Sequence, residues 1–269
     1  MNKIYLVSKK PNELSDIETN AIVTLHHQFF DLRAEDIIGY SKERTYVDLY
    51  YEKGTEKLIG TVGVQWYLHN DIAIVYVGNA VIDKKTHGKG LLTRSILRSV
   101  CKTSFKFPLK RKFLLGFATS PKAYSYFTQY KYSWPKPFEE VPNYINDIIG
   151  NFLSTYYPQN HKPHEHGYII FPKEASIRAK DKNKVLSRFQ DSWFSCSNIY
   201  YEEGYQLPCI ASINAQNYWV LIKSVVNLPK KSAIKRALNK LKQYTFRFKD
   251  ALYLTAMAIL IFLLYSDYY

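Results

Sequence analysis

The stretch that decides the fold is VGNAVIDKKTHGKGLLTRSIL, from Val77 to Leu97. It closes a run rich in β-branched residues over Ile72–Ile82, which predicts a strand. It then opens a segment over Leu91–Lys102 in which apolar residues recur every four positions, which predicts a helix. Between the two lies a loop with two glycines. We therefore expect a strand that leads through a glycine loop into the N-terminus of a helix.

This loop, Asp83–Gly90, has the composition of an anion-binding site. Backbone N–H groups at a helix N-terminus point outward, the helix dipole favours negative charge, and glycine lets a phosphate approach the main chain. The loop also contains Lys84, Lys85 and Lys89. It lacks the Gly-Lys-Ser/Thr of a P-loop and the GxGxxG spacing of a dinucleotide site. Another phosphate-bearing ligand and an ordinary solvated turn are the two interpretations left open.

The surrounding pattern predicts a mixed α+β fold, because strands come first and a helix, a strand and a helix follow. The other strand candidates are Ile4–Val7, Tyr46–Tyr51, Leu58–Trp66 and Phe113–Ala118. In the third of these, strict alternation places Leu58 and Val62 on one face. The other helix candidates are Glu13–Arg33 and a helix from Pro121 to Tyr130, with Ser120 as N-cap.

Two motifs resemble those of the GNAT acyltransferases. Val77–Leu97 is similar to that superfamily's cofactor motif, in which a valine-rich strand precedes a sequence such as RGKGIGSKLL. Leu114–Tyr132, which reads LLGFATSPKAYSYFTQYKY, resembles its later strand–helix motif. The resemblance implies that residues 1–137 form an acyl-CoA-binding domain. Its splayed mixed sheet would be flanked by helices and would hold the cofactor between the strands at Ile72–Ile82 and Phe113–Ala118.

The resemblance also implies which residues bind the cofactor, acetyl-CoA or another acyl-CoA. The backbone of Ala80, Val81 and Ile82 would bind the pantetheine arm. The pyrophosphate would be held by the amides of His87, Gly88, Lys89, Gly90, Leu91 and Leu92. The sequence departs from the family pattern at His87, usually arginine or glutamine, and at Leu92, usually a small residue. A competing register with Lys85 on the pattern predicts the same loop, and an acyl-carrier protein would present the same pantetheine arm.

The catalytic residues are less well marked. The tyrosine that the family often uses as general acid is replaced here by Phe127, which has no proton to donate. Tyr124 lies on roughly the same helix face and is the substitute we expect. Tyr126 and Tyr130 are weaker candidates, and packing is the alternative role of each tyrosine.

A general base is not marked by the sequence either, because the strand at Ile72–Ile82 contains no acidic residue. We expect Asn79 and Ser120 to hold the substrate amine or a water molecule. Transfer from a thioester to an amine needs little help from a base when positioning is good. The absence of a marked base therefore does not exclude catalysis.

Composition narrows the function classes. The net charge of +14 fits an anionic cofactor, a membrane surface or a nucleic acid, but no nucleic-acid-binding module accompanies it, so we disfavour nucleic acid. Three cysteines without CxxC spacing indicate no structural zinc and a reducing compartment. The segment His161–His166 is interpreted as a polar loop rather than a metal site. The start of the chain lacks the apolar core of a secretory signal, so we expect a cytoplasmic protein.

The second half of the chain shows no resemblance to the family. Residues 138–228 are interpreted as an extension that either completes the sheet or covers the substrate, with regular patterns at Tyr144–Leu153, Gly167–Phe171 and Tyr218–Val226. In residues 229–269 a basic stretch, Lys230–Lys249, precedes the apolar run Ala251–Tyr265.

That apolar run is shorter than the roughly 20 residues of a spanning helix, but basic residues directly before it are typical of membrane-proximal segments. We expect an apolar C-terminal helix that anchors the protein to a membrane. A terminal helix buried against the domain or against a second subunit is the alternative.

The sequence therefore predicts an acyl-CoA-dependent N-acyltransferase that moves an acetyl or longer acyl group to an amine at a membrane surface. The alternative is an inactive GNAT-fold binding module tethered to a membrane, which Phe127 and Leu92 favour. The sequence leaves the acceptor, the acyl chain length and the oligomeric state open.

Overall fold

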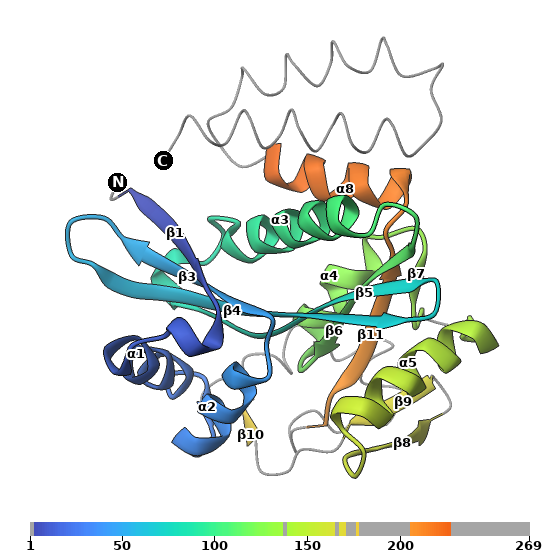
Figure 1. The fold of residues 1–269 in the computed structure, drawn as a ribbon, viewed down its shortest axis with the longest axis horizontal. Coiled ribbons are helices and arrows are strands. Elements are labelled where there is room, and N and C mark those ends of the chain that lie inside the picture. Colours follow the sequence, from blue (N-terminus) through green and yellow to red (C-terminus); the bar gives the residue numbers. More distant parts are fainter. Residues whose placement is uncertain (1–2, 137–138, 165–166, 171–175, 178–204, 227–269) are drawn as a thin grey trace.

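The computed structural model describes residues 3–136, 139–164, 167–170, 176–177 and 205–226. They form a seven-stranded sheet in the order β1-β3-β4-β5-β6-β11-β7, with helices on both faces (Figure 1). All neighbouring strands are antiparallel except β5 and β6, which are parallel. The predicted fold class, a mixed sheet flanked by helices, is confirmed.

The elements have the following bounds. The sheet comprises β1 (Ile4–Lys9), β3 (Tyr46–Glu52), β4 (Lys57–His69), β5 (Ile72–Ile82), β6 (Arg111–Ala118), β7 (Ser133–Trp134) and β11 (Leu207–Ser212). Two short antiparallel pairs lie outside it: β2 (Phe30–Asp31) with β10 (Ser176–Ile177), and β8 (His161–His164) with β9 (Gly167–Ile170). The helices are α1 (Asp16–His26), α2 (Ala34–Lys42), α3 (Leu91–Lys106), α4 (Pro121–Thr128), α5 (Asn143–Tyr156) and α8 (Ala215–Val226), with 3-10 turns at Pro11–Glu13 and Lys84–Thr86.

The structure corrects two of the sequence-based expectations and answers one open alternative. The helical pattern over Glu13–Arg33 was too long, because α1 ends at His26 and the chain continues through β2 into α2. The polar loop expected at the start of His161–His166 is instead strand β8, because its backbone pairs with that of β9. Within residues 138–228, β11 pairs with β6, so this part of the chain completes the sheet.

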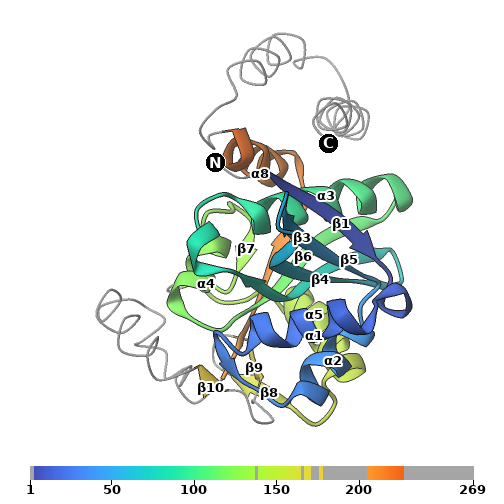
Figure 2. The same cartoon turned by 90° about the vertical axis from the view of Figure 1, so that its left-hand side faces the viewer.

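The core lies in two layers on opposite faces of the sheet. Figures 1 and 2 show α3 and α8 on one face, with α1, α2 and α5 on the other. The α3 layer includes Val77, Leu91, Ile96 and Val100. The opposite layer includes Ile22, Leu25, Ile37 and Val81 under α1 and α2, and Tyr76, Phe152 and Leu153 under α5.

A bulge in β5 reverses the direction of its side chains. Two residues of β5, Asn79 and Ala80, oppose one residue of β4, Val62. Val77 consequently packs in the α3 layer, whereas Val81 packs against α1 and α2. Asn79 takes a left-handed backbone conformation with φ of 49°. The bulge therefore turns β5 just beyond Val77, the last residue that pairs with β6.

Within the residues that the structure describes, every helix is too short or too polar to cross a bilayer. The basic stretch Lys230–Lys249 and the apolar run Ala251–Tyr265, on which the membrane prediction rests, lie outside the described residues.

Candidate active site

The sheet opens between its two parallel strands. β5 and β6 pair from Ile72 opposite Arg111 to Val77 opposite Gly116. Beyond that point β5 continues to Ile82, while β6 pairs with β11 on its other side. The edge of β5 after Val77 therefore faces a gap rather than a neighbouring strand.

A cavity of about 370 Å³ lies at this gap and reaches both layers of the molecule. On the α3 side it is lined by residues that include Leu92, Ile96, Ala123, Tyr126 and Phe127. On the α1 side its lining includes His26, Tyr40, Glu43, Tyr76 and Tyr157. We call these the α3 side and the α1 side of the cavity. A ligand that threads the gap would therefore contact both layers.

The glycine loop ends at the α3 side of this cavity. Gly88 and Gly90 have φ values of 80° and 72°, a conformation that glycine adopts at little cost. Gly90 is the N-cap of α3 and no side chain caps the helix, so the amides of Leu91 and Leu92 have no intrahelical acceptor. These amides are therefore available as donors to an anion.

Two of the six amides predicted to hold a pyrophosphate are already engaged. The amide of His87 donates to the carbonyl oxygen of Lys84 at 3.3 Å, and the amide of Lys89 donates to the carbonyl oxygen of Thr86 at 3.2 Å. The His87 ring lies 2.8 Å from the carbonyl oxygen of Ile82. In the part of the chain that the structure describes, Gly88, Gly90, Leu91 and Leu92 are left as the donors for a ligand.

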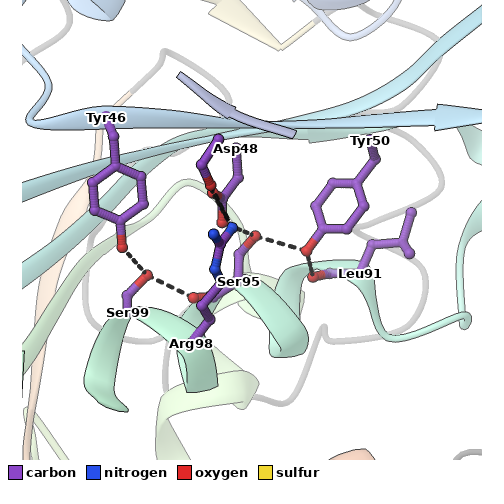
Figure 3. A network of polar contacts seen from close by, with 8 residues as sticks. Tyr46, Asp48, Tyr50, Leu91, Ser95, Arg98 and Ser99 are labelled. Atoms are coloured by element: carbon purple, nitrogen blue, oxygen red, sulfur yellow. Dashed lines mark hydrogen bonds and ion pairs between the residues drawn. The ribbon is translucent and has the colours of Figure 1, made fainter. Parts of the chain in front are cut away.

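A buried polar network fixes the first turns of α3 to β3 (Figure 3). The Asp48 carboxylate is fully buried and accepts from Ser95 Oγ at 2.7 Å, and it pairs with Arg98 Nη1 at 3.2 Å. The Tyr50 hydroxyl donates to the carbonyl oxygen of Leu91 at 2.7 Å. The network therefore holds the N-terminus of α3, and the glycine loop before it, in place against the sheet.

The structure brings one of the three predicted catalytic residues to the cavity. Asn79 lines it, and its Nδ2 is buried without a hydrogen-bond partner. Tyr124 is not among the lining residues; its hydroxyl donates to the carbonyl oxygen of Pro135 at 3.1 Å, and burial raises the pKa of that hydroxyl. Ser120 is engaged as the N-cap of α4, where its Oγ accepts from the amide of Ala123 at 3.2 Å.

Phe127, at the position where the family often has a tyrosine, does reach the gap. A Cβ atom added to Gly116 would lie 2.8 Å from Cζ of Phe127, so the ring tip covers the point where β5 and β6 stop pairing. Its neighbour Tyr126 also lines the cavity, and burial raises the pKa of its hydroxyl. Tyr126 therefore stays protonated at neutral pH.

His26 is a candidate that sequence reasoning missed. Its Nδ1 lies 2.9 Å from the carbonyl oxygen of Ile22, which can only accept, so Nδ1 carries the proton. Nε2 therefore presents a lone pair, and it is buried without a partner. Burial lowers the pKa of His26, which keeps the ring neutral. The residue sits at the end of an apolar helix face, where a histidine gives no sequence signal.

Tyr76 was missed as well. A Cβ atom on Gly78 would lie 2.3 Å from the Tyr76 hydroxyl oxygen, so this hydroxyl lies directly against the backbone beside the bulge. It is 3.4 Å from the hydroxyl of Tyr157. Burial raises the pKa of Tyr76 well above its usual value, so it acts only as a neutral hydrogen-bond donor or acceptor. Among 24 tyrosines nothing in the sequence distinguishes it.

No protein-family model and no curated protein matches this sequence. Solved structures with a similar fold include an acyl-CoA N-acyltransferase from Pseudomonas aeruginosa, at 15% identity and a TM-score of 0.37 over 47% of this chain and 86% of that one. A putative acetyltransferase from Pyrococcus horikoshii has 11% identity and a TM-score of 0.39 over 80% of this chain and 91% of that one. A GNAT family N-acetyltransferase from Escherichia coli in complex with CoA has 15% identity and a TM-score of 0.36 over 47% of this chain and 68% of that one. All three are described as acyltransferases, the class that the two sequence motifs resemble.

Proposed function

We propose that the protein transfers an acyl group from acyl-CoA to an amine. One observation carries the proposal: the amides without intrahelical acceptors at the start of α3 adjoin the cavity at the gap between β5 and β6, since Leu92 lines that cavity. An extended ligand with a phosphate at one end and a reactive group at the other matches this arrangement.

Different residues along the gap would bind different parts of the acyl-CoA. The amides of Gly88, Gly90, Leu91 and Leu92 would hold the pyrophosphate, because a helix N-terminus with glycines before it favours an anion. The unpaired edge of β5 from Ala80 to Ile82 would hydrogen-bond the pantetheine arm as a strand does. This places the thioester beside the bulge, where the acceptor enters from the α1 side.

The transfer forms a bond from the amine nitrogen to the thioester carbonyl carbon and breaks the bond from that carbon to sulfur. The amine must lose a proton, and His26 Nε2 is the unpartnered base that lines the α1 side of the cavity. Asn79 Nδ2 can donate to the carbonyl oxygen as negative charge develops there. Tyr126, kept protonated by burial, can donate to the departing thiolate.

The test is turnover by the full-length protein. Acetyl-CoA is incubated with a panel of amines, free thiol is measured, and the product mass is determined. We expect His26→Gln to lower kcat by about a hundredfold or more, because general base catalysis contributes about that much. The matched control is His27→Gln, since His27 bonds the carbonyl oxygen of Leu32 instead. Equal activity of the two variants would remove His26 from the mechanism.

A second function has one observation in its favour. Phe127 places a ring without a hydroxyl at the gap, as expected if the site binds acyl-CoA without turning it over. Binding of acetyl-CoA with no product from any amine would support such a binding module. The membrane-surface location, a longer acyl chain and an acyl-carrier-protein donor also remain proposals. The first rests on the sequence of residues 229–269 and is tested by co-sedimentation of the full chain with anionic vesicles.

A further inference from the structure

Arg44, between α2 and β3, is a buried arginine that forms no ion pair with a carboxylate of the described residues. It is 4% exposed, and its Nε and Nη2 have no hydrogen-bond partner in the described structure. Its aliphatic part crosses β4 at Gly63, where an added Cβ atom would lie 3.1 Å and 3.2 Å from Cγ and Cδ. A buried charge without a counter-charge is unfavourable unless a ligand supplies one.

The Arg44 side chain does not itself line the cavity, but its guanidinium group contacts two tyrosines that line the α1 side. Its Cζ is 4.8 Å from the centre of the Tyr76 ring, and it also interacts with the Tyr157 hydroxyl. Both tyrosines line the cavity, and their hydroxyl oxygens are 3.4 Å apart. Two neutral hydroxyls backed by a fixed cation form a corner that is complementary to a small anion.

The other titratable groups on this side do not neutralise that corner. Glu43 is the acidic residue among the described lining residues; it attracts Arg44 electrostatically, but its carboxylate is exposed to solvent, which screens the attraction. Burial keeps His26 neutral by lowering its pKa, and it keeps Tyr40 neutral by raising its pKa. The interior of the α1 side is therefore positive, while the carboxylate of Glu43 belongs to its exposed part.

We propose that the acceptor carries a carboxylate beside its amine, as an amino acid does, that the hydroxyls of Tyr76 and Tyr157 bind that carboxylate, and that Arg44 behind them supplies the compensating charge. This inference rests on the proposed acyl transfer, since it takes the α1 side as the acceptor site. The volume supports a small acceptor, because about 370 Å³ must hold the thioester as well. The amine then meets the thioester beside Gly78 while the carboxylate lies against the tyrosine hydroxyls.

The test is product binding, which needs no turnover. N-acetylated amino acids and their uncharged amides, covering all twenty side chains, are titrated into the full-length protein saturated with CoA. We expect at least one acid to bind about tenfold or more tightly than its own amide, which matches the strength of a charge-assisted contact. Arg44→Met should abolish that preference, and Arg44→Lys should retain part of it.

The control variant is Arg111→Met. Arg111 also stacks on a tyrosine, with its Cζ 5.7 Å from the Tyr144 ring centre, but Arg111 is exposed and Tyr144 does not line the cavity. It should leave the acid preference unchanged. The inference would be overturned if the amides bound as tightly as the acids, or if no acid bound at all. Transfer of the acyl group to uncharged amines would still support the proposed function. Failure of CoA itself to bind would instead overturn the proposed function.

Discussion

Removing the buried carboxylate of Asp48 should destabilise the protein more than removing a carboxylate on the surface does. Asp48→Ala takes away the acceptor of Ser95 Oγ and the ion-pair partner of Arg98. Breaking a buried ion pair costs about 3–5 kcal/mol. The Arg98 side chain is 37% exposed and can be rehydrated, so we discount this to about 2–3 kcal/mol. At this chain length that corresponds to a fall in Tm of about 5–10 °C.

The assay is urea unfolding of the full-length protein followed by circular dichroism, with Asp36→Ala as control. Asp36 pairs with Arg33 on the surface at 2.9 Å, so its loss should cost less than about 1 kcal/mol. A double-mutant cycle of Asp48 with Arg98 measures the coupling directly. If Asp48→Ala proved no more destabilising than Asp36→Ala, the network would not be what fixes α3 to the sheet.

Three further changes have defined outcomes. Gly78→Ala places a Cβ atom 2.3 Å from the Tyr76 hydroxyl oxygen, so the Tyr76 ring must shift. Transfer activity should therefore fall at least tenfold, while the affinity for acetyl-CoA changes less. Activity equal to that of the wild type would show that this contact is dispensable. Because burial lowers the pKa of His26, the pH profile of kcat/KM should contain a rise that is complete by about pH 6.5, and His26→Gln should remove that rise. Burial raises the pKa of Glu18, but hydrogen bonds from neighbouring donors outweigh this and lower it to about 2. Its contribution to stability is therefore present above pH 4.5 and lost as the pH falls toward 2, so wild type should lose more stability than Glu18→Gln over that range in a urea series.

The parts of the fold that the sequence predicted are those in which a regular pattern and local signals agree. Ile72–Ile82 and the start of α3 at Leu91 match the structure, because β-branched residues end at a glycine loop and a regular apolar spacing begins after it. Ser120 also caps α4 as predicted. These features depend on residues close in sequence, which is why they can be predicted without tertiary contacts.

The missed parts depend on irregularities and on contacts between distant segments. β11 was not predicted because Pro208 lies within it, and proline is rare inside a sheet. Strict alternation grouped Leu58 with Val62, but an irregularity between β3 and β4 places Leu58 in the α1 layer. The bulge at Asn79 likewise breaks the period of two.

The sequence predicted the local backbone of the glycine loop, but it did not predict the side chains that meet at the cavity. The glycine loop has a sequence signature because Gly88 and Gly90 take left-handed backbone conformations before the helix. His26, Arg44 and Tyr76 meet around the cavity only after folding, and each looks like an ordinary residue of its own element. Buried polar atoms without partners identify the first two, and that property does not exist in a sequence.

The measurement that tests the central claim most directly is calorimetric titration of CoA into the full-length wild type, Gly90→Asp and Gly90→Asn. Both substituents tolerate the left-handed conformation at this position and have nearly the same shape, so the variants differ chiefly in charge. We predict that wild type binds CoA, and that Gly90→Asp binds at least tenfold more weakly than Gly90→Asn because its carboxylate opposes the pyrophosphate. No binding by wild type, or equal binding by the two variants, would contradict the assignment of this loop as the phosphate site.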